Sequence, residues 1–168
     1  MKKIISLSTL LIMLFSVNAQ VNPHAIGVRL GSGFGNNYSS SNVELSYQHG
    51  LGDAHRIELD LGLNLGISSY NGATYLQSLL SGAYHWDWNI VAGFNWYIGP
   101  GAQVGFYSSS SINSFIFGVG GQGGVEYDFN THGIPILVSL DVRPMYNIGS
   151  TSINGMYFTN AGSIRYVF

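Results

Sequence analysis

Hydrophobic and polar residues alternate through the stretch RIELDLGLNLGI, residues 56–67. Every second position holds Ile or Leu, and the positions between them hold Glu58, Asp60, Asn64 or glycine. A period of two is typical of a β-strand, because successive side chains of a strand point to opposite faces. The pattern predicts a strand with one apolar face and one face that carries carboxylates.

Seven further segments show the same alternation, separated by polar or glycine-containing stretches. We expect strands over residues 25–34, 43–48, 56–67, about 75–86, about 90–106, 115–129, 136–146 and 156–168. The segment 43–48 is short and must extend into its flanks, and Gly99-Pro100-Gly101 predicts a bulge or bend. Longer loops, such as residues 35–42, alternate with shorter turns, such as Asp87–Asn89.

The amino-acid composition indicates whether these strands face water or a membrane. Charged residues make up 8% of the 168 residues, whereas 46% are hydrophobic, and a soluble surface usually carries about 25–35% charged residues. After residue 19 no apolar run is long enough for a membrane-spanning helix. A closed barrel satisfies its backbone hydrogen bonds between strands. We therefore predict an all-β fold, an eight-stranded antiparallel up-and-down transmembrane β-barrel, over residues 20–168.

Residues 1–19 have the three parts of a secretory signal peptide. MKK is a charged start, IISLSTLLIMLFS is an apolar core, and Val17 and Ala19 occupy the small-residue positions of a cleavage site. We expect export to the bacterial outer membrane, and an even number of strands would put both termini in the periplasm. The absence of Cys excludes disulfides and lipid anchoring through Cys.

The charged residues predict which face of the strands points inward. An Arg in the lipid midplane costs about 2–4 kcal/mol, so the charged face should line the lumen, which eight strands leave just wide enough for side chains. Parity predicts a lumen charge network of Arg29, Glu44, Glu58, Asp60, Glu126, Asp141, Arg143 and Arg165. Buried charges must be paired, and water and five polar side chains should complete the network: Gln48, Gln77, Tyr97, Gln103 and Gln122.

The alternation allows two other interpretations. A soluble, lipocalin-like barrel would turn the Leu face inward, but its outer surface would then carry almost no Lys. Lumen carboxylates could perform acid–base chemistry, but structural pairing with Arg accounts for them more simply. Aromatic residues at segment ends predict a girdle at each rim.

The last residues, SIRYVF, resemble the C-terminal signal read by the outer-membrane assembly machinery, with Ile164, Tyr166 and Phe168 at alternate positions. The whole chain after residue 19 resembles the small outer-membrane β-barrel proteins of the OmpX and OmpA transmembrane-domain kind. NWYIGPGAQVGFY and IPILVSLDVRP are similar to stretches of porin-like outer membrane protein β-barrel domains of Bacteroidetes type. The resemblance implies an outer-membrane location and eight strands, and it implies no substrate.

Two families of small barrels are enzymes that modify lipid A, and their motifs can be compared with this sequence. The lipid A deacylase type uses a His followed two residues later by Ser, whereas the five His here are followed by Ile26, Leu51, Ile57, Asp87 and Ile134. No polar triad of the palmitoyltransferase type is evident at the predicted outer rim. His and acidic residues lack metal-ligand spacing, and no basic patch suggests nucleic acid.

We therefore expect a non-enzymatic, monomeric outer-membrane barrel with a structural or surface-interaction role and a side-chain-filled lumen. Its expected partners are outer-membrane lipid, lipopolysaccharide and the assembly machinery, with no cofactor, no metal and no nucleic acid. The stretches 36–42 and 108–113 are the predicted interaction loops. A narrow pore for small solutes and a lipid A-modifying enzyme remain as alternatives.

Overall fold

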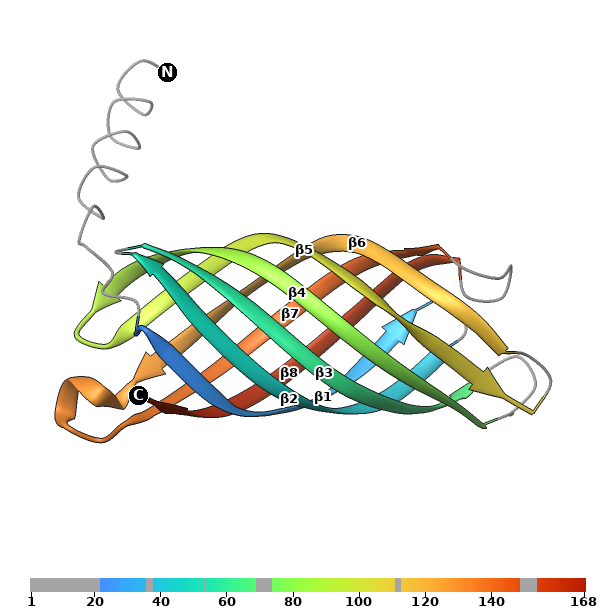
Figure 1. Cartoon of the computed structure of the whole chain (residues 1–168), viewed down its shortest axis with the longest axis horizontal. Helices are drawn as coiled ribbons and strands as arrows, with labels where there is room; N and C mark the ends of the chain where they lie inside the picture. Colours follow the sequence, from blue (N-terminus) through green and yellow to red (C-terminus); the bar gives the residue numbers. More distant parts are fainter. Residues whose placement is uncertain (1–21, 36–37, 53, 69–73, 111–112, 149–153) are drawn as a thin grey trace, which may run out of the picture.

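Eight antiparallel strands form a closed barrel in the computed structural model (Figure 1). The structure describes residues 22–35, 38–52, 54–68, 74–110, 113–148 and 154–168, and the predicted signal peptide lies outside them. The strands are β1 (His24–Gly35), β2 (Tyr38–Gly52), β3 (His55–Ser68), β4 (Thr74–Val91), β5 (Phe94–Ser109), β6 (Asn113–Asp128), β7 (Ile136–Ile148) and β8 (Gly155–Val167). The predicted eight-stranded up-and-down barrel is confirmed.

Closure of the barrel depends on the pairing of β1 with β8. The two strands share a continuous register from Ala25 opposite Val167 to Gly35 opposite Tyr157. Every other strand pairs with the strands before and after it in the sequence. A closed sheet has no free edge, so the backbone N–H and C=O groups are satisfied within the wall, as a hydrocarbon environment requires.

The two ends of the barrel differ in their connections. The terminal rim holds the start of β1, the end of β8 and the β2–β3, β4–β5 and β6–β7 turns (left in Figure 1), and the loop rim holds the other connections. The β4–β5 turn contains Gly93, with φ of 81°. The β6–β7 turn contains a short 3-10 helix, η1 (Phe129–His132), which ends at Gly133 with φ of 78°. Both turns use a backbone conformation that favours glycine.

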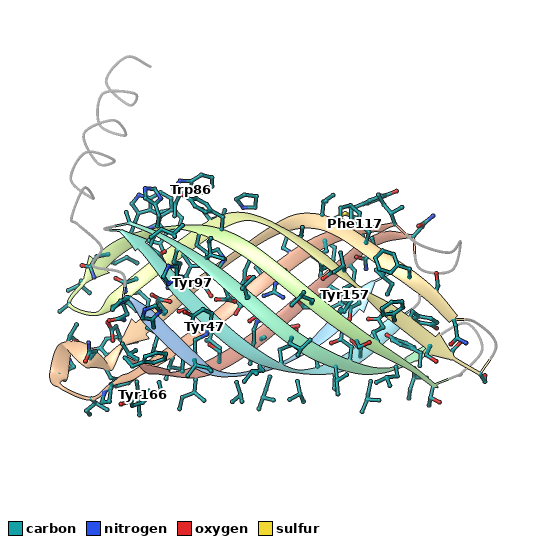
Figure 2. All side chains as sticks on the ribbon, viewed as in Figure 1. Tyr47, Trp86, Tyr97, Phe117, Tyr157 and Tyr166 are labelled. Carbon is teal, nitrogen blue, oxygen red and sulfur yellow. The ribbon has the colours of Figure 1, made fainter. Side chains whose placement is uncertain are left out.

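The two faces of the strands carry opposite chemistry. In β3, Leu59 and Leu61 are 46% and 60% exposed, whereas Glu58 and Asp60 are 0% and 1% exposed. The apolar side chains therefore project outward from the wall, and the carboxylates point into the lumen (Figure 2). This arrangement excludes the soluble barrel with an apolar interior, and it suits an outer surface in contact with acyl chains.

Aromatic side chains form a band near each rim, as the sequence predicts. At the terminal rim, Trp88 stacks on Trp96 with ring centroids 4.4 Å apart, and Trp86 lies at the same end (Figure 2). Near the loop rim, Phe106 meets Phe115 edge to face at 5.5 Å. Amphipathic or bulky rings at both interfaces are typical of membrane-spanning barrels.

Several predicted boundaries are wrong because the strands run further than the apolar alternation. Asp87–Asn89, predicted as a turn, belongs to β4, and the chain turns at Ala92–Gly93. Tyr38–Asn42, predicted as part of a loop, belongs to β2. Ser40 and Asn42 point into the lumen, and the outward positions hold Ser39 and Ser41, so the strand continues here without an apolar outer face.

Two further details differ from the prediction. Phe129 lies in η1 and not at the end of the sixth strand. The pairing of β5 shows no shift of register at Pro100, because Gly101 and Ile98 keep partners that are in step, opposite Ala83 and Trp86. The register shift between β4 and β5 lies instead at Asn89–Val91.

The exterior chemistry predicts a position-dependent cost of introducing charge. Leu61→Arg, at the middle of β3, should lower the free energy of unfolding by about 2–4 kcal/mol, whereas Val91→Arg, at the end of β4, should cost about 0–1 kcal/mol. Urea unfolding of the barrel refolded in lipid vesicles measures both values. Equal costs at the two positions would contradict an acyl-chain environment around β3.

Candidate functional site

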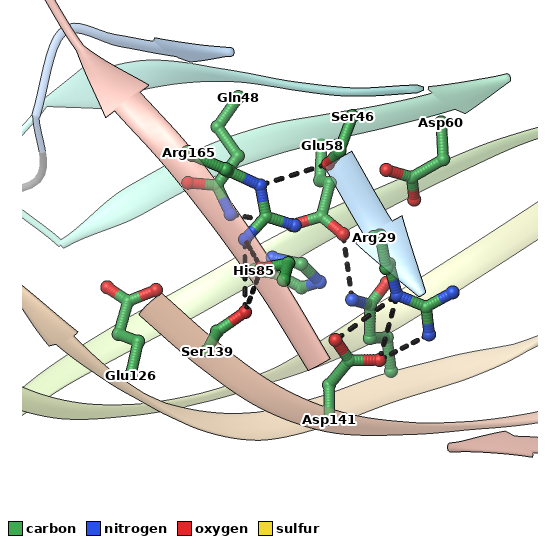
Figure 3. Close-up of polar contacts among 12 residues, drawn as sticks. Arg29, Ser46, Gln48, Glu58, Asp60, His85, Glu126, Ser139, Asp141 and Arg165 are labelled. Carbon is green, nitrogen blue, oxygen red and sulfur yellow. Dashed lines mark hydrogen bonds and ion pairs between the residues drawn. The ribbon is translucent and has the colours of Figure 1, made fainter. Parts of the chain in front are cut away.

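A network of charged side chains fills the middle of the lumen, and Arg29 of β1 anchors one side of it (Figure 3). Arg29 Nη1 lies 2.7 Å from Glu44 Oε2. Its Nε donates to both carboxylate oxygens of Asp141, each at 3.2 Å, and its Nη2 also contacts Asp141. Because all three side chains are buried, this multiple pairing offsets the desolvation of the guanidinium.

Arg143 of β7 crosses the lumen to the opposite wall. Its Nη2 forms an ion pair with Asp60 of β3 and lies 3.5 Å from Glu58 Oε1. Its Nη1 lies 3.5 Å from Glu44 Oε2, so Glu44 joins Arg143 to Arg29. Strands β7 and β3 are not neighbours in the wall, and these contacts therefore brace the barrel across its interior.

Glu58 is the centre of the network. Arg165 Nη2 lies 3.1 Å from Glu58 Oε2. Gln48 and Gln122 donate to the two carboxylate oxygens at 2.6 and 2.8 Å. With Arg143 as well, one fully buried carboxylate receives four partners from four strands. Arg165 also donates to three hydroxyls, those of Ser46, Ser139 and Ser163.

A second cluster lies nearer the terminal rim and centres on Arg56 of β3. Arg56 Nη1 lies 2.7 Å from Glu126 Oε2 and 3.3 Å from Asp87 Oδ1. Its Nε donates to His85 Nδ1 at 3.3 Å, and its guanidinium lies 4.4 Å from the centre of the Tyr97 ring. The cluster is separate in composition from the central network, although both line the same lumen.

The structure places all eight predicted charged residues in the lumen but divides them between the two clusters. Seven belong to the central network, whereas Glu126 pairs with Arg56. Arg56 and Asp87 were missing from the prediction. Arg56 has the same parity as Glu58, so the alternation itself could have identified it. Asp87 was missed because its segment was interpreted as a turn.

The predicted polar partners behave differently from one another. Gln48 and Gln122 do contact the charged groups, as described above. Gln103 instead donates to Asn147 at 2.7 Å, and Gln77 accepts from Asn64 at 3.2 Å. These amide pairs lie outside the charged clusters and fill the part of the lumen nearer the loop rim.

Apolar side chains line part of the lumen wall on both sides of the charged clusters. Towards the loop rim, Tyr75 and Tyr107 stack with centroids 5.1 Å apart and pack with Leu79 and Ile116. At the terminal rim the buried layer consists of Ala25, Leu137 and Val167. Along the barrel axis, the described buried side chains therefore change from apolar at the terminal rim to charged in the middle, and to amide and apolar groups towards the loop rim.

Negative charge exceeds positive charge among the described lumen residues. Six carboxylates face four guanidiniums, with Asp128 set apart because it caps η1. Asp87 shows the imbalance most clearly, since both its oxygens are buried without a hydrogen bond. The described residues contain no group of three or more His, Cys, Asp or Glu side chains placed to hold a metal ion. The chemistry of the clusters is the pairing of guanidiniums with carboxylates.

Comparison with known proteins identifies the fold. No family model matches the chain, and no curated protein matches it. The chain is similar to Neisserial surface protein A (NspA), with a TM-score of 0.68 and 14% identity over 86% of this chain and 96% of that one. It is also similar to the outer membrane enzyme PagL, with a TM-score of 0.53 and 13% identity over 86% and 99% of the two chains.

A third structure is Ail, the attachment invasion locus protein of Yersinia pestis, solved with the heparin analogue sucrose octasulfate. Its TM-score is 0.53, with 12% identity over 86% of this chain and 96% of that one. The chain has the fold of the small outer-membrane β-barrels. At these identities the likeness concerns the fold of the barrel alone, so its role has to be argued from its own residues.

The two kinds of lumen carboxylate should differ in their effect on stability. Asp141→Asn removes the main partner of Arg29 and leaves a buried cation underpaired, which should lower the free energy of unfolding by about 3–5 kcal/mol. Asp87→Asn removes a carboxylate that accepts no hydrogen bond and whose ion pair with Arg56 is the longer of two, and because Arg56 keeps Glu126 it should change that energy by about 1 kcal/mol or less. Urea unfolding in detergent micelles compares the two, and equal losses would contradict the proposed imbalance.

Proposed function

We propose that this chain is a non-enzymatic integral protein of the bacterial outer membrane, with a structural or surface-interaction role and a lumen that does not conduct solutes. The observation that carries the proposal is the network of buried ion pairs that crosses the lumen. Each of the four Arg side chains is held by buried partners, and apolar layers lie on both sides of them. Opening a path would require breaking buried ion pairs, which is costly.

The export and insertion route follows from the predicted signal peptide and from the end of β8. Ile164, Tyr166 and Phe168 are exposed on the outer face of the barrel, where the assembly machinery could reach them during insertion. With both ends of the barrel domain at the terminal rim, we propose that this rim faces the periplasm. The loop rim would then face outward, towards lipopolysaccharide and other partners.

The surface available to such partners lacks positive charge. No Lys follows Lys3, and all four remaining cationic side chains are Arg residues buried in the lumen. The sulfated ligand of Ail therefore has no evident counterpart here, because polyanions are bound through exposed Arg and Lys. Surface contacts of this barrel would instead rely on hydroxyl and amide groups, such as the exposed pair Ser108 and Asn113, which share a hydrogen bond of 2.8 Å.

Ion conductance tests the closed lumen. The purified barrel, whose folding is verified by heat-modifiable gel migration, should give no steady channel current in planar bilayers. A Tyr75→Ala/Tyr107→Ala variant removes the loop-rim layer and should also stay closed, because the charged clusters remain. Large stepwise currents from the wild-type barrel would favour the alternative of a narrow pore.

Lipid analysis tests the alternative of a lipid A-modifying enzyme. The fold likeness to PagL is the reason to consider it, but no His of this chain is followed two residues later by Ser. Within the lumen, His85 Nδ1 already accepts from Arg56. Mass spectra of lipid A from cells with and without the protein should therefore be identical, and a new acylation state would contradict the proposal.

A further inference from the structure

Two histidines face each other on the outside of the terminal rim. His24 of β1 and His49 of β2 are direct register partners, and their Nδ1 atoms lie 3.3 Å apart. The hydroxyl of Tyr47 lies 2.9 Å from His24 Nδ1. Phe168 stacks on the His24 ring with centroids 5.4 Å apart. Neither imidazole takes part in the lumen clusters described above.

The separation of the two nitrogens suits a shared metal ion. Imidazole nitrogens bind Zn²⁺ at about 2.0–2.1 Å in tetrahedral geometry, which places two such nitrogens about 3.3 Å apart. The two rings share a hydrogen bond at this distance, and the same spacing allows both nitrogens to bind one ion once neither Nδ1 carries a proton.

The surroundings leave room for the remaining ligands. His49 is exposed and His24 is half-buried, so water can complete the coordination. Stacking of Phe168 holds the His24 ring, and Tyr47 can bind the ion through its hydroxyl or orient a bound water. A site built of imidazoles suits Zn²⁺, Cu²⁺ or Ni²⁺ rather than Ca²⁺ or Mg²⁺.

We propose that His24 and His49 form a binding site for one divalent transition metal ion at the terminal rim, with Tyr47 as a supporting group. Both imidazoles bind through Nδ1 and keep their proton on Nε2. Among divalent ions the site prefers Cu²⁺ over Ni²⁺ and Zn²⁺, following the general order of stability. A bound ion links β1 to β2 beside the β1–β8 closure, and it therefore stabilises the start of β1. The site is independent of the proposed closed lumen.

Metal titration of the folded barrel tests the site. The probes are Zn²⁺ and Cu²⁺ added to the detergent-refolded protein, with binding followed by calorimetry and the Cu²⁺ ligands by electron paramagnetic resonance. The wild type should bind one ion per barrel, with a Cu²⁺ spectrum of two equivalent nitrogens. His24→Asn and His49→Asn should each abolish binding at the concentrations that saturate the wild type, and Tyr47→Phe should weaken it about tenfold.

A matched control separates the site from general histidine binding. His132 of η1 lies on the same rim and contacts Tyr127 at 2.9 Å, so His132→Asn should leave binding unchanged. Heat-modifiable migration checks that each variant is folded. Absence of binding by the wild type, loss of binding in His132→Asn, or retention in either His24→Asn or His49→Asn would overturn the proposal.

Discussion

The structure depends on one constraint: every backbone N–H and C=O group inside the hydrocarbon must find its partner within the protein. The pairing of β1 with β8 meets this constraint by closing the wall. Closure then determines the rest. It creates an inside and an outside, so a period of two places one residue on the outer surface and the next in a narrow lumen. Arg side chains within the wall therefore turn into that lumen, where buried carboxylates pair with them.

The geometry of Arg explains how four cations can pair with carboxylates on several strands. Eight strands leave a lumen of side-chain width, and four guanidiniums, each with several donors, can reach carboxylates on distant strands. Arg143 of β7 binds Asp60 of β3, and Arg29 of β1 binds Asp141 of β7. Lys would serve poorly here because it offers a single charged point without the planar fork. These contacts connect opposite walls of the barrel, and most of them converge on Glu58, which contacts side chains from four other strands.

Alternation in the sequence was enough to predict the strand number, the inward face and the membership of most of the charge network, because parity is a local property. The same alternation places Arg56, two residues before Glu58, on the inward face, although the prediction did not include it. The pairings themselves could not be predicted. Whether Glu126 meets Arg56 or Arg143 depends on strand stagger and on how far each side chain reaches across the lumen. The stretch Tyr38–Asn42 was predicted as a loop because its outward positions, Ser39 and Ser41, are polar, so the apolar alternation stops before the strand does.

The same reasoning explains why the fold persists at 12–14% identity to NspA, PagL and Ail. A barrel in a bilayer requires alternating inward and outward residues, a closed sheet and an apolar exterior, and many different residues can meet these requirements. Lumen charges can change provided that they remain paired, and rim residues are freer still. What distinguishes one small barrel from another should therefore be sought where this constraint ends. In this chain the terminal rim is such a place: His24, His49, His55 and His132 all lie there, and the closure of the barrel does not depend on their imidazoles, because it is made by backbone pairing of β1 with β8.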